Sequence, residues 1–241
     1  MHEMSTNPDF VVLISANAEW RVIRKCFLES GIYPSPYGEW FTYLYREIPL
    51  LKKPIVFIHG GWGKVAASGS TQYAISRWHP RMVINLGTCG GFEGKIDKGE
   101  IILVEKTIIY DIFEQMGDPK EHIAHYSIEI DTSWLNPPLP LQVKRTLLVS
   151  GDRDLFYDDI PSLISKYGAI AGDWESGAIA WVANKNHTQC LILRGVTDLV
   201  GESGGEAYGG NVAYYYENTE LIMNKLIESL PLWLLKYTDH I

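Results

Sequence analysis

Four short segments of the sequence place polar side chains directly after a run of apolar residues. They are Ser15–Glu19, Gly87–Gly91, Asp173–Ser176 and Arg194–Asp198. Apolar runs of this length are typical of buried strands, and α/β proteins bind ligands at the carboxyl ends of such strands. Loops and helix N-termini with unpaired backbone N–H groups also gather there. These four segments are therefore the candidates for a functional site.

Each segment also has a purely structural interpretation. Glu19 would favour the N-terminus of a helix, and the glycines of residues 87–91 would fit a turn. Asp173 would fit an N-cap, with Glu175 as a solvated carboxylate in the turn that follows, and Asp198 would cap the segment after it. Taken one at a time, none of the four segments is specific for a function.

The elements that must position these residues alternate between short apolar runs and helical patterns. This alternation predicts a largely parallel or mixed sheet with crossover helices. We find no internal repeat and no linker, so residues 1–241 are interpreted as one α/β domain. The expected strands are Phe10–Ile14, Ile55–Ile58, Met82–Leu86, Ile101–Val104, Thr107–Tyr110, Leu147–Ser150 and Cys190–Gly195. The expected helices are Glu19–Leu28, Lys64–Trp78, Trp174–Asn184 and Tyr214–Leu230, and Gln115–Pro140 is expected to be an irregular surface segment.

Composition excludes several classes of protein. The chain has 241 residues and a net charge of −8, with 29 acidic residues against 21 basic ones, which argues against a nucleic-acid binder. No apolar run approaches the roughly 20 residues of a membrane span. The first residues have neither the basic nor the apolar region of a signal peptide, and three scattered cysteines form no disulfide framework. We therefore expect a cytoplasmic protein that does not bind membranes.

Five motifs recur in the order typical of one family. They are Gly61–Ala67 (Gly-Trp-Gly-Lys-Val-Ala-Ala), Val83–Gly91 (Val-Ile-Asn-Leu-Gly-Thr-Cys-Gly-Gly), Ser150–Asp152 (Ser-Gly-Asp), Trp174–Ala180 (Trp-Glu-Ser-Gly-Ala-Ile-Ala) and Leu193–Asp198 (Leu-Arg-Gly-Val-Thr-Asp). With them the chain resembles the nucleoside phosphorylase/hydrolase superfamily, and most closely the 5'-methylthioadenosine/S-adenosylhomocysteine nucleosidases, from about Val11 to Asp198. The resemblance implies a three-layer α/β domain whose mixed, curved central sheet is flanked by helices.

The resemblance also implies a reaction and three carboxylates that perform it. The base of a nucleoside leaves through an oxocarbenium-like transition state, so a general acid must protonate the purine at N7, and Asp198 matches that acid. Glu175 matches the carboxylate that holds the ribose hydroxyls and favours the cationic sugar. Glu19 matches the carboxylate that orients and deprotonates the attacking water.

Other substrate-binding residues follow from the same motifs. Gly87, Thr88, Arg194 and Thr197 lie in the matching segments around the pocket. Trp174 stands where the family commonly has a methionine against the ribose, and an indole there would stack on the nucleoside or narrow its pocket. After Ser150–Asp152 the chain carries an extra residue, so Phe156 is our choice for the ring that stacks on the base, with Leu155 as the alternative. The tyrosines 214–216 are interpreted as core packing.

The sequence favours water over phosphate as the nucleophile. Phosphorylases of this superfamily hold phosphate with an arginine two residues before the glycine of the Gly-Thr motif, where this chain has Asn85, and with an early Gly-Asp-Pro-x-Arg element that is missing here. Arg21, Arg24 and Arg194 remain candidates for a different anion site. A phosphorylase and a non-catalytic nucleoside-binding protein are therefore kept as alternatives to a hydrolase.

The resemblance further implies the partners. It implies a small nucleoside as the substrate, and a reaction that uses neither a cofactor nor a metal. Family members complete the pocket with residues of a neighbouring subunit, and residues 110–115 resemble the segment that crosses over. We therefore expect a homodimer whose apolar interface contains Ile112 and Phe113.

Overall fold

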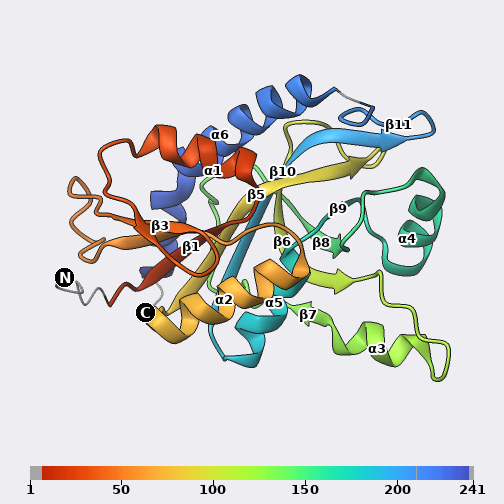
Figure 1. The fold of residues 1–241 in the computed structure, drawn as a ribbon, viewed down its shortest axis with the longest axis horizontal. Coiled ribbons are helices and arrows are strands. Elements are labelled where there is room, and N and C mark those ends of the chain that lie inside the picture. Colours follow the sequence, from red (N-terminus) through yellow and green to blue (C-terminus); the bar gives the residue numbers. More distant parts are fainter. Residues whose placement is uncertain (1–6, 210, 239–241) are drawn as a thin grey trace.

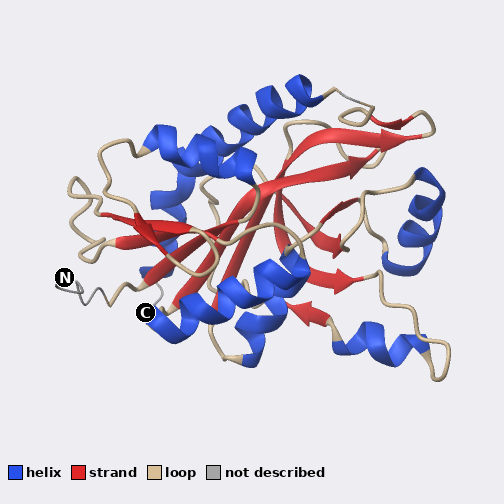
Figure 2. Cartoon of the chain, in the orientation of Figure 1, coloured by secondary structure: helices blue, strands red, loops and turns tan. Residues whose placement is uncertain are grey.

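The computed structural model describes residues 7–209 and 211–238 and confirms the expected α/β architecture, with a mixed, curved sheet between helices (Figures 1 and 2). Its strands are β1 (Phe10–Ile14), β2 (Tyr33–Pro34), β3 (Glu39–Tyr43), β4 (Ile55–His59), β5 (Met82–Phe92), β6 (Ile101–Ile109), β7 (Ser127–Glu129), β8 (Lys144–Ser150), β9 (Ala171–Asp173), β10 (Gln189–Gly201) and β11 (Gly204–Gly205). Its helices are α1 (Asn17–Cys26), α2 (Lys64–Trp78), α3 (Pro119–His125), α4 (Ile160–Tyr167), α5 (Ser176–Lys185) and α6 (Val212–Thr238), with a 3₁₀ turn at Tyr157–Asp159.

The first strand, β1, explains why the central strands are apolar throughout. Phe10, Val12 and Ile14 pack in the core beneath α1 and α6, whereas Val11 and Leu13 pack in the core against α2 and α5. Successive side chains of a strand point to opposite faces, so a strand covered on both faces must be apolar at every position. Figure 1 shows the two helix pairs on opposite sides of the sheet.

The sheet curls until one end closes on itself. β10 runs parallel to β5 from Gln189 to Val200, on the edge of β5 opposite to the one that pairs with β1 and β9. Because β9, β8 and β6 complete the path back to β10, five strands form a closed ring. The strands β1, β4, β3 and β2 continue from this ring as an open sheet.

Two strands are longer than the sequence predicts. β5 runs to Phe92 and β10 to Gly201, where we expected them to end at Leu86 and Gly195. The turn that we considered for residues 87–91 does not form, because these residues pair with β10 on one side, and Gly90 and Gly91 pair with β9 on the other. Their glycines serve close packing instead of a turn, and a Cβ on Gly87 would collide with the guanidinium of Arg194.

Three further segments differ from expectation. β6 is one strand where we predicted two, because a bulge opposite β8 at Glu105 interrupts the apolar pattern without ending the strand. The segment 115–140 contains α3 and β7. The helix α4 and the short strand β9 were not among the elements that we predicted from the sequence. In the described part of the chain no helix is both long and apolar enough to cross a membrane.

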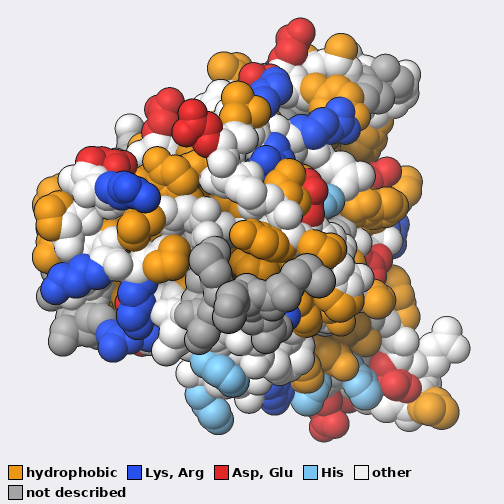
Figure 3. Space-filling view, turned by 60° about the vertical axis from the view of Figure 1, so that its left-hand side comes forward, with side chains coloured by type: hydrophobic (Ala, Val, Ile, Leu, Met, Phe, Trp, Pro, Cys, Tyr) orange, Lys and Arg blue, Asp and Glu red, His pale blue; other side chains and the backbone are white. Residues whose placement is uncertain are grey.

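Large apolar side chains are exposed at several places on the surface of the protein. Figure 3 shows one face, on which apolar side chains lie between charged groups.

Candidate active site

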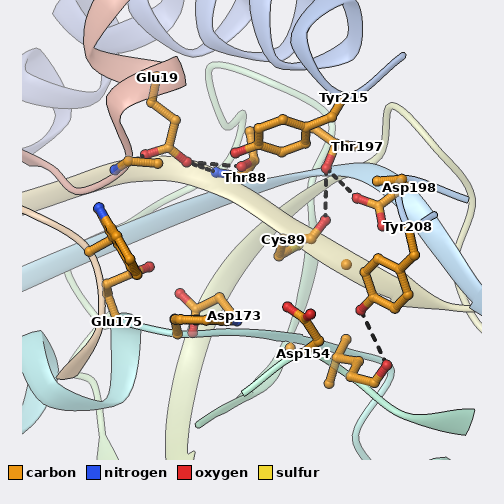
Figure 4. Close-up of a pocket in the computed structure, with 17 residues that line it drawn as sticks. Glu19, Thr88, Cys89, Asp154, Asp173, Glu175, Thr197, Asp198, Tyr208 and Tyr215 are labelled. Atoms are coloured by element: carbon orange, nitrogen blue, oxygen red, sulfur yellow. Dashed lines mark hydrogen bonds between the residues drawn. The ribbon is translucent and has the colours of Figure 1, made fainter. Parts of the chain in front are cut away.

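A pocket of about 330 Å³ collects residues from all four segments that the sequence singled out (Figure 4). It opens where β1, β5, β9 and β10 carry polar residues. The predicted residues that line it are Glu19, Thr88, Trp174, Glu175, Thr197 and Asp198.

Glu19 lies at the start of α1 and is held from two sides. Its Oε2 accepts a hydrogen bond from the backbone N–H of Ala16 at 3.1 Å. Its Oε1 accepts from the backbone N–H and the hydroxyl of Thr88, at 2.7 and 2.9 Å. Only 2% of Glu19 is exposed. The structural interpretation of this residue is confirmed, and the carboxylate that caps α1 also lies in the pocket wall.

Asp198 owes its position to a bulge in β10. The register against β5 shifts between Val196 and Asp198, so that Asp198 lies opposite Gly90 and Thr197 is the extra residue. Both Thr197 and Asp198 line the pocket, and the Thr197 hydroxyl donates to Asp198 Oδ1 at 2.7 Å. Burial raises the pKa of Asp198 above its ordinary value, against the opposing effect of this hydrogen bond.

Glu175 precedes α5 and reaches across to the turn before α2. Its Oε1 accepts a hydrogen bond from the backbone N–H of Gly63 at 2.9 Å. Gly63 has a φ of +85°, a conformation that favours glycine. Burial first, and then the charge of Asp173, raise the pKa of Glu175 to about 8, although Arg194 acts in the opposite direction.

Arg194 lies fully buried behind the pocket and joins three elements. Its Nε donates to the Ser176 hydroxyl at 2.9 Å, and its Nη2 donates to Asn85 Oδ1 at 2.6 Å. Nη2 also lies 2.8 Å from Asp173 Oδ2. Asp173 in turn accepts a hydrogen bond from the backbone N–H of Ser176, the first residue of α5. The N-cap of α5 is Glu175, which is buried, so the interpretation of Asp173 as the N-cap and of Glu175 as a solvated carboxylate was wrong.

Both terminal nitrogens of this guanidinium also lie near a carboxylate of the pocket wall. Arg194 Nη1 lies 3.9 Å from Glu19 Oε1, and Nη2 lies 3.9 Å from Glu175 Oε2. Nη1 is buried and has no hydrogen-bond partner among residues 7–209 and 211–238. Both 3.9 Å separations are longer than a hydrogen bond, so Arg194 attracts the two carboxylates without bonding to them.

Three residues that we predicted to bind substrate do not line the pocket. Gly87 and Arg194 lie behind its wall, where the first makes room for the second. Phe156 is 53% exposed and stacks with the guanidinium of Arg153. Its neighbour Leu155, our alternative, is buried and lines the pocket.

Sequence reasoning missed four prominent residues of the pocket wall. These are Trp62, Asp154, Tyr208 and Tyr215. Tyr208 lies in the glycine-rich segment after β10, and its hydroxyl donates to the backbone carbonyl of Leu155 at 3.2 Å. Tyr215 belongs to the tyrosine run that we interpreted as core packing. Tyr208, an isolated aromatic residue in a glycine-rich segment, was the one feature of the sequence that could have indicated a further residue of the pocket wall.

Comparisons with known proteins agree on one family. The family model described as the phosphorylase superfamily matches residues 33–228. The 5'-methylthioadenosine/S-adenosylhomocysteine nucleosidase of Marinomonas sp. is 25% identical over 190 residues, which cover 73% of this chain and 81% of that protein. The protein of the same name from Thermotoga maritima is 26% identical over 173 residues, covering 71% and 78%.

Solved structures show the same fold. A nucleosidase of the same name from Helicobacter pylori, in complex with a pyrrolidine inhibitor, has a TM-score of 0.76 and 18% identity, covering 95% of this chain and 98% of that chain. The native futalosine hydrolase of the same organism has a TM-score of 0.75 and 17% identity, covering 93% and 98%.

The buried position of Arg194 predicts a large and pH-dependent loss of stability in Arg194→Met. Removing one partner of a buried ion pair costs about 3–5 kcal/mol of unfolding free energy, because it leaves carboxylates buried without a cation. Their pKa values in the folded variant would exceed those in the unfolded chain, so the loss grows as pH rises and shrinks as they become protonated. Urea unfolding at pH 5 and pH 8 measures both effects.

The matched control is Arg21→Met, which removes a guanidinium that bonds at the surface to Tyr216 and to the Asn17 carbonyl. We expect its unfolding free energy to change by less than about 0.5 kcal/mol. An Arg194→Met loss no larger than that of the control, or one that is larger at pH 5 than at pH 8, would contradict the prediction.

Proposed function

Because this chain belongs to the phosphorylase superfamily, we propose that it is a nucleosidase that hydrolyses the N-glycosidic bond of a purine nucleoside. The substrate is a 5'-modified adenosine, such as methylthioadenosine or S-adenosylhomocysteine, and the base released is adenine. The observation that carries the proposal is that Glu19, Glu175 and Asp198 line one pocket of about 330 Å³, which matches the size of a nucleoside. No cofactor enters the reaction.

Asp198 is the general acid in this proposal. An adenine anion is a poor leaving group, so the base must receive a proton at N7 as the glycosidic bond breaks. Burial favours the protonated carboxyl, which is the form that can donate. The bulge in β10 directs this carboxyl into the pocket, where a purine edge can reach it.

Glu175 holds the ribose. Its carboxyl group lies at the opposite end of the labelled pocket from Asp198 (Figure 4), and its Oε1 is oriented by the N–H of Gly63. A carboxyl group in this place bonds to the ribose hydroxyls. Its ionised form, which predominates above the pKa of about 8, also favours the positive charge that develops on the sugar in an oxocarbenium-like transition state.

Glu19 orients and deprotonates the attacking water. Its Oε1 already accepts two hydrogen bonds from Thr88, whereas its Oε2 accepts one, from the backbone N–H of Ala16. A carboxylate oxygen can accept more than one hydrogen bond, so Oε2 has room for a water molecule that enters from the pocket. Water held in this way would face the pocket beside Glu19.

The charge of the pocket favours hydrolysis over phosphorolysis. Among the residues that the structure describes, every charged side chain of the pocket wall is acidic: Glu19, Asp154, Asp173, Glu175 and Asp198. Arg21 and Arg24, two of the candidates for an anion site, bond elsewhere, to Tyr216 and to the carbonyl of Phe27 respectively. Phosphate would meet carboxylates at short range, whereas water carries no charge.

The experiment that tests the function follows release of the base. We expect the purified protein to release adenine from methylthioadenosine in phosphate-free buffer, with a free pentose as the other product, since water is the nucleophile. Added phosphate should change neither the rate nor the product. A pentose 1-phosphate would identify a phosphorylase, and nucleoside binding without release of a base would identify a binding protein.

Two amide variants test the catalytic roles. Asp198→Asn keeps the shape but cannot donate the proton, and general acid catalysis contributes about 10²–10⁴-fold, so kcat should fall by at least about 10² with a much smaller change in substrate affinity. Glu19→Gln should also abolish turnover, by removing the base that activates water. The surface substitution Asp158→Asn is the matched control. Near-wild-type kcat in a folded Asp198→Asn protein would contradict the assignment.

We also propose that two copies associate in a cytoplasmic homodimer. Val65 at the start of α2 and Phe113 after β6 are 85% and 84% exposed, and Met116 is 97% exposed. Beside them lies a hollow of about 560 Å³ whose wall includes Val65, Ile112 and Trp181. Apolar side chains exposed in this way are typical of a surface that another chain covers, and a homodimer would bury the same patch on both subunits.

The dimer prediction is tested by light scattering. The wild-type protein should have twice the mass of one chain at micromolar concentration, and Phe113→Glu should reduce that mass because it places a charge in an apolar interface. The control is Leu221→Glu on α6, which changes another exposed apolar residue. A wild-type monomer, or equal loss of mass in both variants, would overturn the interface.

A further inference from the structure

Two tryptophans stand together at one end of the pocket. The ring centroids of Trp62 and Trp174 are 6.0 Å apart and their planes meet at 60°. Both residues line the pocket, and Trp62 is 62% exposed. An indole is the largest apolar surface that a side chain can bury, so an indole left this exposed in a pocket wall is available to a ligand.

The two indoles are tied to the carboxylate that would hold the ribose. Trp174 directly precedes Glu175 in the chain, and Trp62 directly precedes Gly63, whose N–H donates to Glu175 Oε1 at 2.9 Å. Figure 4 shows Glu175 and Asp198 at opposite ends of the pocket. The backbone of both tryptophans is therefore held next to Glu175, at the end of the pocket opposite to Asp198.

The covalent structure of a nucleoside decides which part of it reaches the indoles. The base is attached to C1′ and the 5′ carbon to C4′, on either side of the ring oxygen. With the base at Asp198 and the hydroxyls at Glu175, the 5′ substituent extends from the sugar on the side away from the base. It would then lie against Trp62 and Trp174.

Two indoles inclined at 60° suit a flat ring better than a methyl group. A ring that stacks on the face of one indole receives an edge contact from the other, and aromatic pairs contribute beyond the area they bury. A charged amino-acid tail fits less well, because its carboxylate would find no cationic side chain in the described pocket wall, where Glu19, Asp173 and Glu175 are acidic.

We propose that the 5′ substituent of the natural substrate carries an aromatic ring, which Trp62 and Trp174 bind. This rests on the nucleosidase function proposed above and changes one part of it, because methylthioadenosine and S-adenosylhomocysteine carry no aromatic ring and would be poorer substrates than the natural one. Trp62 and Trp174 are then the residues that determine specificity for the 5′ group, and they take no part in bond cleavage.

The test compares three adenosines that differ only in the 5′ group: phenylthio, cyclohexylthio and methylthio. We expect kcat/KM to be at least about 10-fold higher for phenylthio than for methylthio, and higher for phenylthio than for cyclohexylthio, which is apolar and similar in size but not flat. Trp62→Leu and Trp174→Met should each reduce the phenylthio-to-methylthio ratio by about 2–12-fold, the range that corresponds to one aromatic pair. Tyr33→Leu, at an exposed aromatic residue on β2, should leave the ratio unchanged.

A second measurement separates this inference from the proposed function. Calorimetric titration of the same three compounds into Glu19→Gln protein reports affinity without turnover, and the phenylthio compound should bind most tightly. Release of adenine from none of the compounds would overturn the nucleosidase function, whereas the order of affinities would still test the aromatic site. Equal or weaker binding of the phenylthio compound, or a ratio unaffected by either tryptophan variant, would overturn the inference.

Discussion

A single buried guanidinium holds the pocket together. Arg194 comes from β10, bonds to Asn85 on β5 and to Ser176 on α5, and pairs with Asp173 at the end of β9. An arginine with no exposed surface is tolerable only when carboxylates and acceptors surround it, so the position of each element is linked to the others through one side chain. Glycine at position 87 follows from the same constraint, because any Cβ there would occupy the space of the guanidinium.

This arrangement gives the two catalytic carboxylates different surroundings. Glu19, the proposed base, accepts three hydrogen bonds and lies near the buried cation. Asp198, the proposed acid, lies on a bulged strand, accepts a hydrogen bond from Thr197, and has a raised pKa because it is buried. The two carboxylates proposed for opposite roles therefore have different environments in one pocket.

The three carboxylates of the pocket wall to which we assign the reaction were predictable from the sequence because each lies in a local motif. Glu19, Glu175 and Asp198 sit at fixed places relative to a strand end or a helix start, and local patterns report such places. The turn considered for residues 87–91 does not form, and the ring of Phe156 was predicted wrongly, because strand pairing with β10 and the direction of a side chain after an extra residue depend on contacts distant in sequence. Trp62, Asp154 and Tyr208 were missed for the same reason.

The pocket wall is consequently built by two different physical means. One part consists of buried charges on paired strands and helix starts, where one displaced atom leaves a carboxylate or a guanidinium without its partner. The other part consists of Trp62 on a glycine turn and Trp174 beside it, whose contact is apolar and of which Trp62 is largely exposed. Apolar contacts tolerate a change of shape far better than a network of buried charges does. A fold organised in this way can keep one reaction while its substrate changes, and that is why the motifs in the sequence identify the bond that is broken more firmly than the molecule that carries it.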